Sequence, residues 1–213
     1  MKNLVYKEWR LAIHPTGYIF LLMGAMLLIP HYPYYVAFFY QTLGIFFIFM
    51  SGNTNNDVFF TTLLPVRKRD VVKARLSTVI GLELFQIIVA MPFAILRGKI
   101  APAENMAGMD ANLALFGLVF IMFGVFNVVF LPMFYRTAYK TGTPFMLATS
   151  VMTTVVLAAE LVIQFTPSLK QALDTSTYTS MQMIVLIVGM LIFAFLNLAA
   201  YRLSANAFER LDL

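Results

Sequence analysis

The chain has 213 residues, of which 61% are hydrophobic and 12% are charged, and its formal net charge is +5. A soluble domain is about 45–50% apolar and about 25% charged, so the composition argues against a soluble enzyme, a coiled coil and a disordered chain. Roughly 130 apolar residues would fill about six membrane spans of about 20 residues each. The composition therefore predicts an all-α, polytopic membrane protein with six transmembrane helices.

Residues 1–15 predict a short amphipathic helix that precedes a single transmembrane domain over residues 16–213. Apolar residues recur there at helical spacing: Leu4, Val5, Trp9, Ala12 and Ile13. Basic residues fall on the opposite side: Lys7, Arg10 and His14. Such a helix typically lies in the plane of the membrane interface, and Pro15 separates it from the first span. The alternative is a simple basic anchor before that span.

Apolar runs predict the six spans. They cover residues 16–29, 36–51, 70–96, 113–134, 144–166 and 180–201. The segment 167–179 reads as a short polar loop, and 202–213 reads as a short tail. The largest connection is a polar segment over residues 52–70, between the second and third spans.

Basic residues predict the orientation of the chain. Twelve of the 15 Lys and Arg residues fall on one set of sides: Lys2, Lys7, Arg10, Arg67, Lys68, Arg69, Lys73, Arg75, Arg136, Lys140, Arg202 and Arg210. The positive-inside rule places these sides, and with them both termini, in the cytoplasm of a multi-pass plasma-membrane protein. Because the charge is accounted for by topology, nucleic acid is not expected as a partner.

The loop 52–70 carries the most specific pattern in the chain. Thr54-x-x-Asp57 resembles a capping box, and Pro65 disfavours helix at Leu64, which predicts a helix over 55–63. This helix is too short to cross a bilayer, yet it carries Phe59, Phe60, Leu63 and Leu64. Exposed apolar residues of this kind suit either the docking of another protein or contact with lipid headgroups.

The string from Asp57 to Arg75 contains Leu-Leu-Pro-Val at residues 63–66, followed by Arg69-Asp70-Val71-Val72. This string resembles the corresponding segment of the small permease subunits of type-2 ABC exporters. The resemblance implies that the short helix is a coupling helix, which rests in a cleft of a separate ABC ATPase. The residues implied in docking are Asp57, Phe59, Phe60, Leu63, Leu64, Pro65, Val66, Arg67 and Arg69. It also implies an N-terminal elbow helix and a second permease subunit, identical or paralogous. Larger members have re-entrant helices between the last two spans, for which 167–179 is too short.

No nucleotide-binding motif is found in the chain. Gly98-Lys99 is the only Gly-Lys pair, and Phe93 stands where the first glycine of G-x-x-x-x-G-K-[ST] would fall. We therefore expect no cofactor on this chain, with ATP and Mg²⁺ bound by the partner ATPase.

Polar residues inside the predicted spans are candidates for a substrate path: Glu83, Gln86, Asn127 and Glu160. Charged groups within a bilayer are costly and usually face protein or water. The alternative role is hydrogen bonding between helices. Similarly, Ala114, Gly117 and Gly124 are expected to permit close helix packing.

Enzymatic chemistry is not expected. The two histidines, His14 and His31, fall on opposite sides of the membrane, so no metal site is expected, and the chain has no cysteine. The sequence thus predicts a membrane permease subunit that exports a hydrophobic or amphipathic substrate, such as a peptide, a drug or a lipid-like molecule. The alternatives are a six-span substrate-capture subunit of an importer or another solute transporter, and a non-transporting immunity or sensory protein.

Overall fold

The structure is a computed structural model that describes residues 2–13, 15–100, 105–174 and 178–211. Within these residues every regular element is a helix. Five helices are long and apolar enough to cross a membrane, and the N-terminal pair Lys2–Arg10 and Pro15–Leu28, which bends by 83°, raises the number to as many as six. The all-α polytopic fold agrees with the sequence prediction.

The N-terminal segment forms α1 (Lys2–Lys7), which continues as a π-helical turn, η1 (Glu8–Ala12). Apolar contact with the bundle is made by Leu4 and by Trp9, whose ring lies against Gly81. His14, which the sequence placed on the basic face, lies outside the described residues. The position of this helix in the membrane interface stays a prediction.

The predicted first span folds as α2 (Pro15–Leu21) followed by a 3₁₀ helix, η2 (Leu22–Leu28). The prediction gave no hint of this change in helix type. Because a 3₁₀ helix rises about 2.0 Å per residue instead of about 1.5 Å, the segment is about 24 Å long rather than about 21 Å. Gly24 of η2 lies against the backbone of Ala90, which allows close packing.

The remaining spans are longer than the apolar runs that predicted them. They are α3 (Tyr35–Thr54), α5 (Lys68–Ile100), α6 (Leu113–Tyr135), α7 (Gly142–Phe165) and α9 (Thr179–Glu209). Two predictions were wrong. The loop 167–179 contains a short helix, α8 (Pro167–Asp174), and the tail after 201 continues α9 by two turns. The α9 extension is helical because Ser204, Ala205 and Phe208 are buried on one face.

The core of the bundle is aromatic. Phe49 of α3 makes edge-to-face contacts with Phe130 and Phe134 of α6, at ring-centroid distances of 5.0 and 4.7 Å. The most extensive helix contact joins α6 and α9, which cross at Gly117 and Gly189. The bundle interior is therefore filled with side chains.

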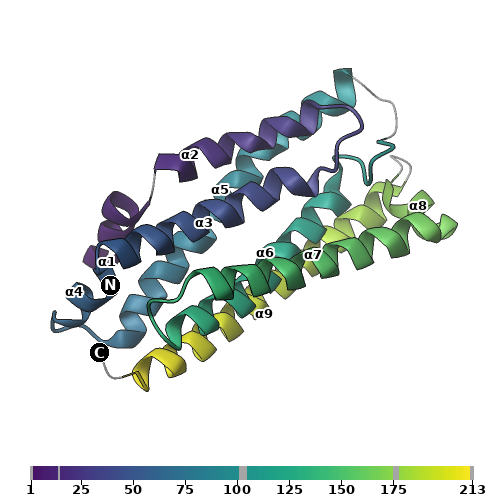
Figure 1. Ribbon diagram of the computed structural model, residues 1–213. Coiled ribbons are helices and arrows are strands. Elements are labelled where there is room, and N and C mark those ends of the chain that lie inside the picture. The colour runs from purple at the N-terminus through teal and green to yellow at the C-terminus, as the bar shows by residue number, and fades with distance from the viewer. Residues whose placement is uncertain (1, 14, 101–104, 175–177, 212–213) are drawn as a thin grey trace.

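Both termini lie at one end of the bundle, together with α1 and a short helix, α4 (Asp57–Thr62) (Figure 1). The opposite end carries the turn before α3, the 105–112 loop and α8 (Figure 1). Hydrogen bonds join these three segments to one another: Asn105 Nδ2 donates to the carbonyl of Tyr32, and the Asp110 backbone amide donates to the Asp174 carboxylate. The functional candidates can be located relative to these two ends.

Candidate functional site

The helix α4 begins where Asn56 reverses the chain. Asn56 has φ 51° and ψ 32°, a left-handed conformation that asparagine adopts more readily than most residues. The capping box was wrong: Thr54 ends α3 and donates to the Met50 carbonyl, and no side chain caps α4. The helix is accordingly shorter than predicted, at six residues.

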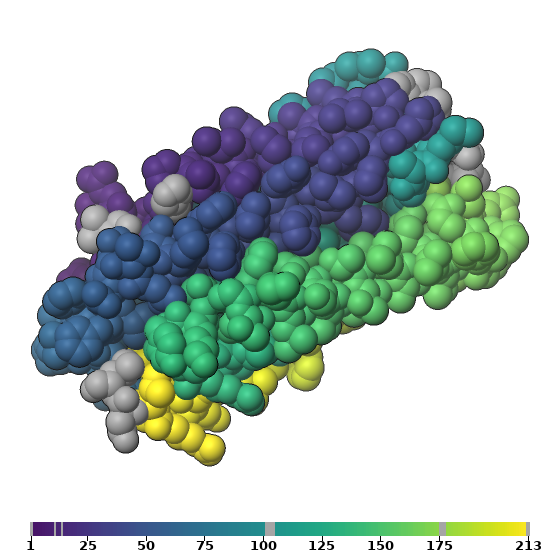
Figure 2. Space-filling view, viewed as in Figure 1, coloured from purple at the N-terminus to yellow at the C-terminus, as the bar shows by residue number. Residues whose placement is uncertain are grey.

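The outward face of α4 and the residues after it are apolar. Phe59 is 49% exposed, Phe60 60%, Leu63 67% and Leu64 53%. Pro65 and Arg67 are also exposed, whereas Val66 is partly buried. In the space-filling view the blue segment that contains α4 forms the left end of the molecule (Figure 2). An apolar surface at the end of a membrane bundle suits contact with another molecule.

Arg69 is 55% exposed, but its guanidinium is occupied by the C-terminal segment. Its Nε and Nη2 donate to the two carboxylate oxygens of Glu209 at 2.6 and 2.8 Å. Lys68 next to it donates to the carbonyl of Leu211 at 2.5 Å. These contacts join the start of α5 to the end of α9, so both basic residues fix the C-terminal segment.

Asp57 also points into the protein. Its carboxylate pairs with Lys7 and lies 2.5 Å from Nη2 of Arg75. Lys7 donates to Thr61 Oγ1 at 2.7 Å, and the buried Arg75 pairs in addition with Glu8. An ion cluster formed by Lys7, Glu8, Asp57 and Arg75 therefore joins the N-terminal helix, α4 and α5.

The electrostatics of this cluster favour the ionised form of Asp57. Burial by itself raises the pKa of the Asp57 carboxyl, but the charges and hydrogen bonds of Arg75 and Lys7 outweigh it and lower the pKa below its ordinary value. The Arg75 guanidinium also lies 5.2 Å from the centre of the Phe49 ring. Asp57 is thus held in its ionised form, and the Arg75 side chain that pairs with it is packed against the aromatic core.

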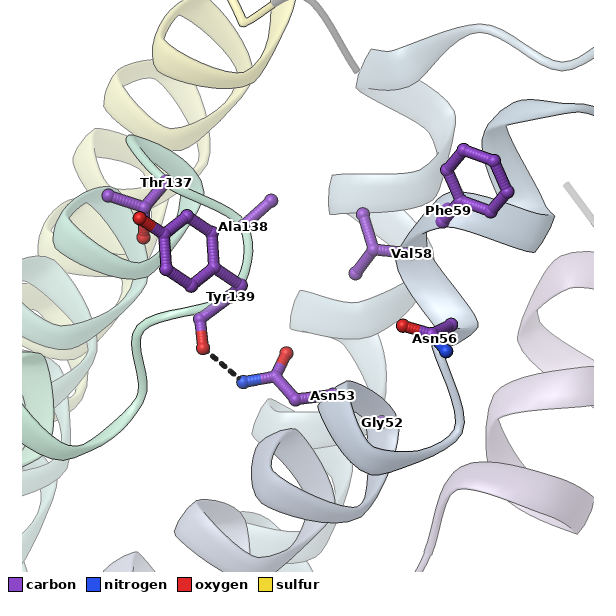
Figure 3. Close-up of a pocket in the computed structure, with 8 residues that line it drawn as sticks. All are labelled: Gly52, Asn53, Asn56, Val58, Phe59, Thr137, Ala138 and Tyr139. Carbon is purple, nitrogen blue, oxygen red and sulfur yellow. Dashed lines mark hydrogen bonds between the residues drawn. The ribbon is translucent and has the colours of Figure 1, made fainter.

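A small hollow of about 110 Å³ lies beside α4. Its walls come from the end of α3, from α4 and from the loop between α6 and α7 (Figure 3): Gly52, Asn53, Asn56, Val58, Phe59, Thr137, Ala138 and Tyr139. Asn53 Nδ2 donates to the Tyr139 carbonyl at 2.5 Å and closes one side (Figure 3). The hollow could accept about one side chain of a molecule placed on α4.

Three of the four candidates for a substrate path are fully buried in this chain. Glu83 accepts a hydrogen bond from Asn127 Nδ2 at 2.9 Å, and the same amide donates to Asn197 Oδ1 at 3.0 Å. Gln86 donates to the Ala37 carbonyl at 2.8 Å. In this arrangement the three residues hold helices together, and their role in a substrate path stays a prediction.

Glu160 lies near the opposite end, partly buried. Gln164 Nε2 donates to its Oε1 at 3.1 Å, and the Tyr35 hydroxyl donates to Met109 Sδ at 3.5 Å. Glu83 and Glu160 therefore have different partners at different depths. Among the described residues no group of three or more His, Cys, Asp or Glu could hold a metal ion.

Comparison with protein families identifies the class of this protein. The model of the ABC-2 family transporter protein matches residues 3–209, nearly the whole chain. The chain belongs to the ABC-2 transporter family. No curated protein and no solved structure matches it.

This ABC-2 permease is thus a multi-pass membrane subunit of an ABC transporter, and the family implies partnership with an ABC ATPase and a lipid bilayer. The members of this family are the membrane subunits of transporters. The match agrees with the family resemblance seen around residues 57–75.

Sequence reasoning missed the ion cluster of this permease, although its residues left a signal. Glu8 is four residues from both Leu4 and Ala12, which places it on the apolar face of the N-terminal helix. Arg75 likewise falls among the buried Val71, Val72, Leu76 and Val79 of α5. A charge on an otherwise apolar face predicts a buried partner of opposite charge.

Proposed function

We propose that this permease exports a hydrophobic or amphipathic substrate out of the cell, with ATP and Mg²⁺ bound by a separate ABC ATPase that docks on α4. The observation that carries the proposal is the exposed apolar surface of Phe59, Phe60, Leu63 and Leu64 at the α4 end of the bundle. Basic residues beside it, such as Arg67, support a cytoplasmic location of this end by the positive-inside rule, and the ATPase would be found on that side.

A second permease subunit, identical or paralogous, completes the proposed transporter. The interior of a single chain is filled by aromatic side chains, with Glu83, Gln86 and Asn127 buried among the helices. A path for an amphipathic molecule is therefore better accommodated between two permeases than through one. The broadly exposed apolar faces of α7 and α9 are consistent with contacts to lipid, cargo or that second subunit.

Movement of α4 is the proposed link between ATP hydrolysis and transport. Closure of the ATPases would push on α4, and rigid contacts with the bundle would switch access from one side of the membrane to the other. Such coupling requires that the docked ATPase bind the two arrangements with different affinities.

The first test is whether the neighbouring reading frame encodes an ABC ATPase, and the second is co-purification of the permease with that ATPase. The double variant Phe59→Asp plus Leu63→Asp is expected to lose most of the bound ATPase, because two carboxylates would be desolvated in an apolar contact. Substrate-stimulated ATP hydrolysis in proteoliposomes is expected to fall at least tenfold.

Met106→Asp provides the matched control, since Met106 is 88% exposed in the loop at the opposite end. It is expected to retain the ATPase and its stimulated hydrolysis. Full binding and full stimulated hydrolysis by the α4 double variant would overturn the docking proposal.

A further inference from the structure

Arg75 is the point at which three separate elements meet. It is 4% exposed, and its guanidinium contacts Glu8 of the N-terminal helix and Asp57 of α4 while its own backbone lies in α5. Glu8 is 2% exposed, so this part of the cluster is shielded from solvent. Lys7 adds a second connection, because it binds both Asp57 and Thr61 of α4.

Burial makes this connection strong. Two exposed ions gain little from pairing, because water and salt screen them. A buried carboxylate without its partner, in contrast, retains the whole desolvation cost. Separation of the N-terminal helix from α4 would leave Lys7 without Asp57. Movement of the N-terminal helix away from Arg75 would take this partner from the buried Glu8, and movement of α4 would take it from the partly buried Asp57.

The N-terminal helix is held against α5 by a second, apolar contact. The ring of Trp9 lies so close to Gly81 that a Cβ at this glycine would be 2.6 Å from Trp9 Cζ2. The ion cluster and this contact are about 1.7 helical turns apart on α5, from residue 75 to residue 81. Two attachment points fix both the position and the direction of the N-terminal helix.

We propose that Arg75 is a positioning residue that fastens α4 to the N-terminal helix, so that the two elements move as one body on α5. This proposal deepens the function proposed above, in which the push on α4 comes from the docked ATPase. A force applied to α4 would then reach the first span through the N-terminal helix and the third span through α5.

The chain is well suited to a direct test because it has no cysteine and a single tryptophan, Trp9. Spin labels at Tyr6→Cys and Phe60→Cys, positions that are 63% and 60% exposed, would report the distance between the N-terminal helix and α4. The labelled permease is measured alone in lipid nanodiscs by pulsed electron paramagnetic resonance, and acrylamide quenching of Trp9 is measured in parallel.

Arg75→Gln is expected to broaden the distance distribution at least twofold and to raise the Trp9 quenching constant about twofold. Asp57→Asn removes one carboxylate and leaves the Arg75–Glu8 pair in place, so it is expected to broaden the distribution without loss of the fold. Arg75→Lys keeps the positive charge but replaces the forked guanidinium with a single ammonium group. It is expected to give a distance distribution of intermediate width.

Glu209→Gln is the matched control. It makes the same change of carboxylate to amide in the ion pair with Arg69, in which both side chains are about half exposed, and it is expected to leave the distribution narrow. An unchanged width in Asp57→Asn, or an equal broadening in Glu209→Gln, would overturn the proposal. If Arg75→Gln does not yield folded protein, Asp57→Asn alone decides the outcome.

The spin-label measurement can fail independently of the ATPase-docking experiment, because no ATPase is present when the distance is measured. Phe59→Asp plus Leu63→Asp should keep the narrow distribution of the parent even where it abolishes ATPase binding. A broad parent distribution would refute the fastening of the two elements and leave the docking proposal standing.

Discussion

Glu83 places a carboxyl group among the helices of the bundle, where Asn127 provides its hydrogen bond. We expect Glu83→Gln to change the free energy of unfolding by about 1 kcal/mol or less, because an amide oxygen accepts the same bond and such bonds between membrane helices are modest. Glu83→Leu is expected to cost about 1–2 kcal/mol, because it leaves Asn127 underpaired. Thermal and denaturant unfolding of the purified permease measures both, and an equal loss in the two variants would argue against this role.

The lowered pKa of Asp57 predicts a loss of stability in acid. The stabilisation from its ion pairs is complete above the ordinary carboxyl pKa of about 4 and is lost as the pH falls through the lower value of the folded state. Thermal unfolding between pH 7 and pH 3 should show this decrease. Asp57→Asn should show a smaller decrease over the same range, and identical pH profiles would contradict the assignment.

At the scale of single residues, the sequence indicated which groups were unusual but not what each one contacted. Glu83 and Asn127 stood out because they interrupt apolar runs. Arg75 was counted among the cytoplasmic basic residues and in the family resemblance but given no partner, because Glu8 and Asp57 lie 67 and 18 positions away. Contacts between residues so distant in sequence depend on the packing of the helices, which periodicity does not specify.

The crossing of α6 and α9 depends on two glycines. A Cβ at Gly189 would overlap the carbonyl oxygen of Gly117, so Gly189→Ala must push the helices apart. We expect it to lower the free energy of unfolding by about 3 kcal/mol, near the upper end for overpacking of a core. Denaturant unfolding followed by circular dichroism measures the change.

Gly98→Ala is the control for this prediction, since a Cβ at Gly98 would meet nothing within 4 Å. Alanine favours helix over glycine by about 0.5–1 kcal/mol, so this variant should be as stable as the parent or slightly more stable. A similar loss in both variants would mean that the crossing does not require Gly189.

The existence of the long helices was easier to predict from the sequence than the residues at which they begin and end. Apolar runs located the five long helices, because lipid requires about 20 apolar residues in each span. Polar residues extend several of these helices beyond the runs: α9 continues to Glu209, where the Arg69–Glu209 pair secures it. The residues Ala200, Ser204 and Phe208 already repeat at intervals of four, a helical signal that polar neighbours obscured.

For the whole molecule, orientation in the membrane is the property that a labelling experiment can establish. With Phe60 predicted in the cytoplasm and Met106 outside, we expect a membrane-impermeant maleimide to label Met106→Cys in intact cells. Phe60→Cys should react only after the membrane is opened. The natural absence of cysteine makes each introduced thiol the sole target, and labelling of Phe60→Cys in intact cells would reverse the predicted topology.

The spans of this molecule do not match one bilayer thickness. The α2–η2 segment is about 24 Å long, whereas the 24 residues of α7 extend about 36 Å. A hydrocarbon core of about 30 Å would therefore thin beside the predicted first span, or that span would draw its flanking residues inward, whereas α7 can tilt or extend its ends into the headgroup region. Such hydrophobic mismatch would give the membrane a local depression along α2 and η2, where lipid tails are shortest and least ordered.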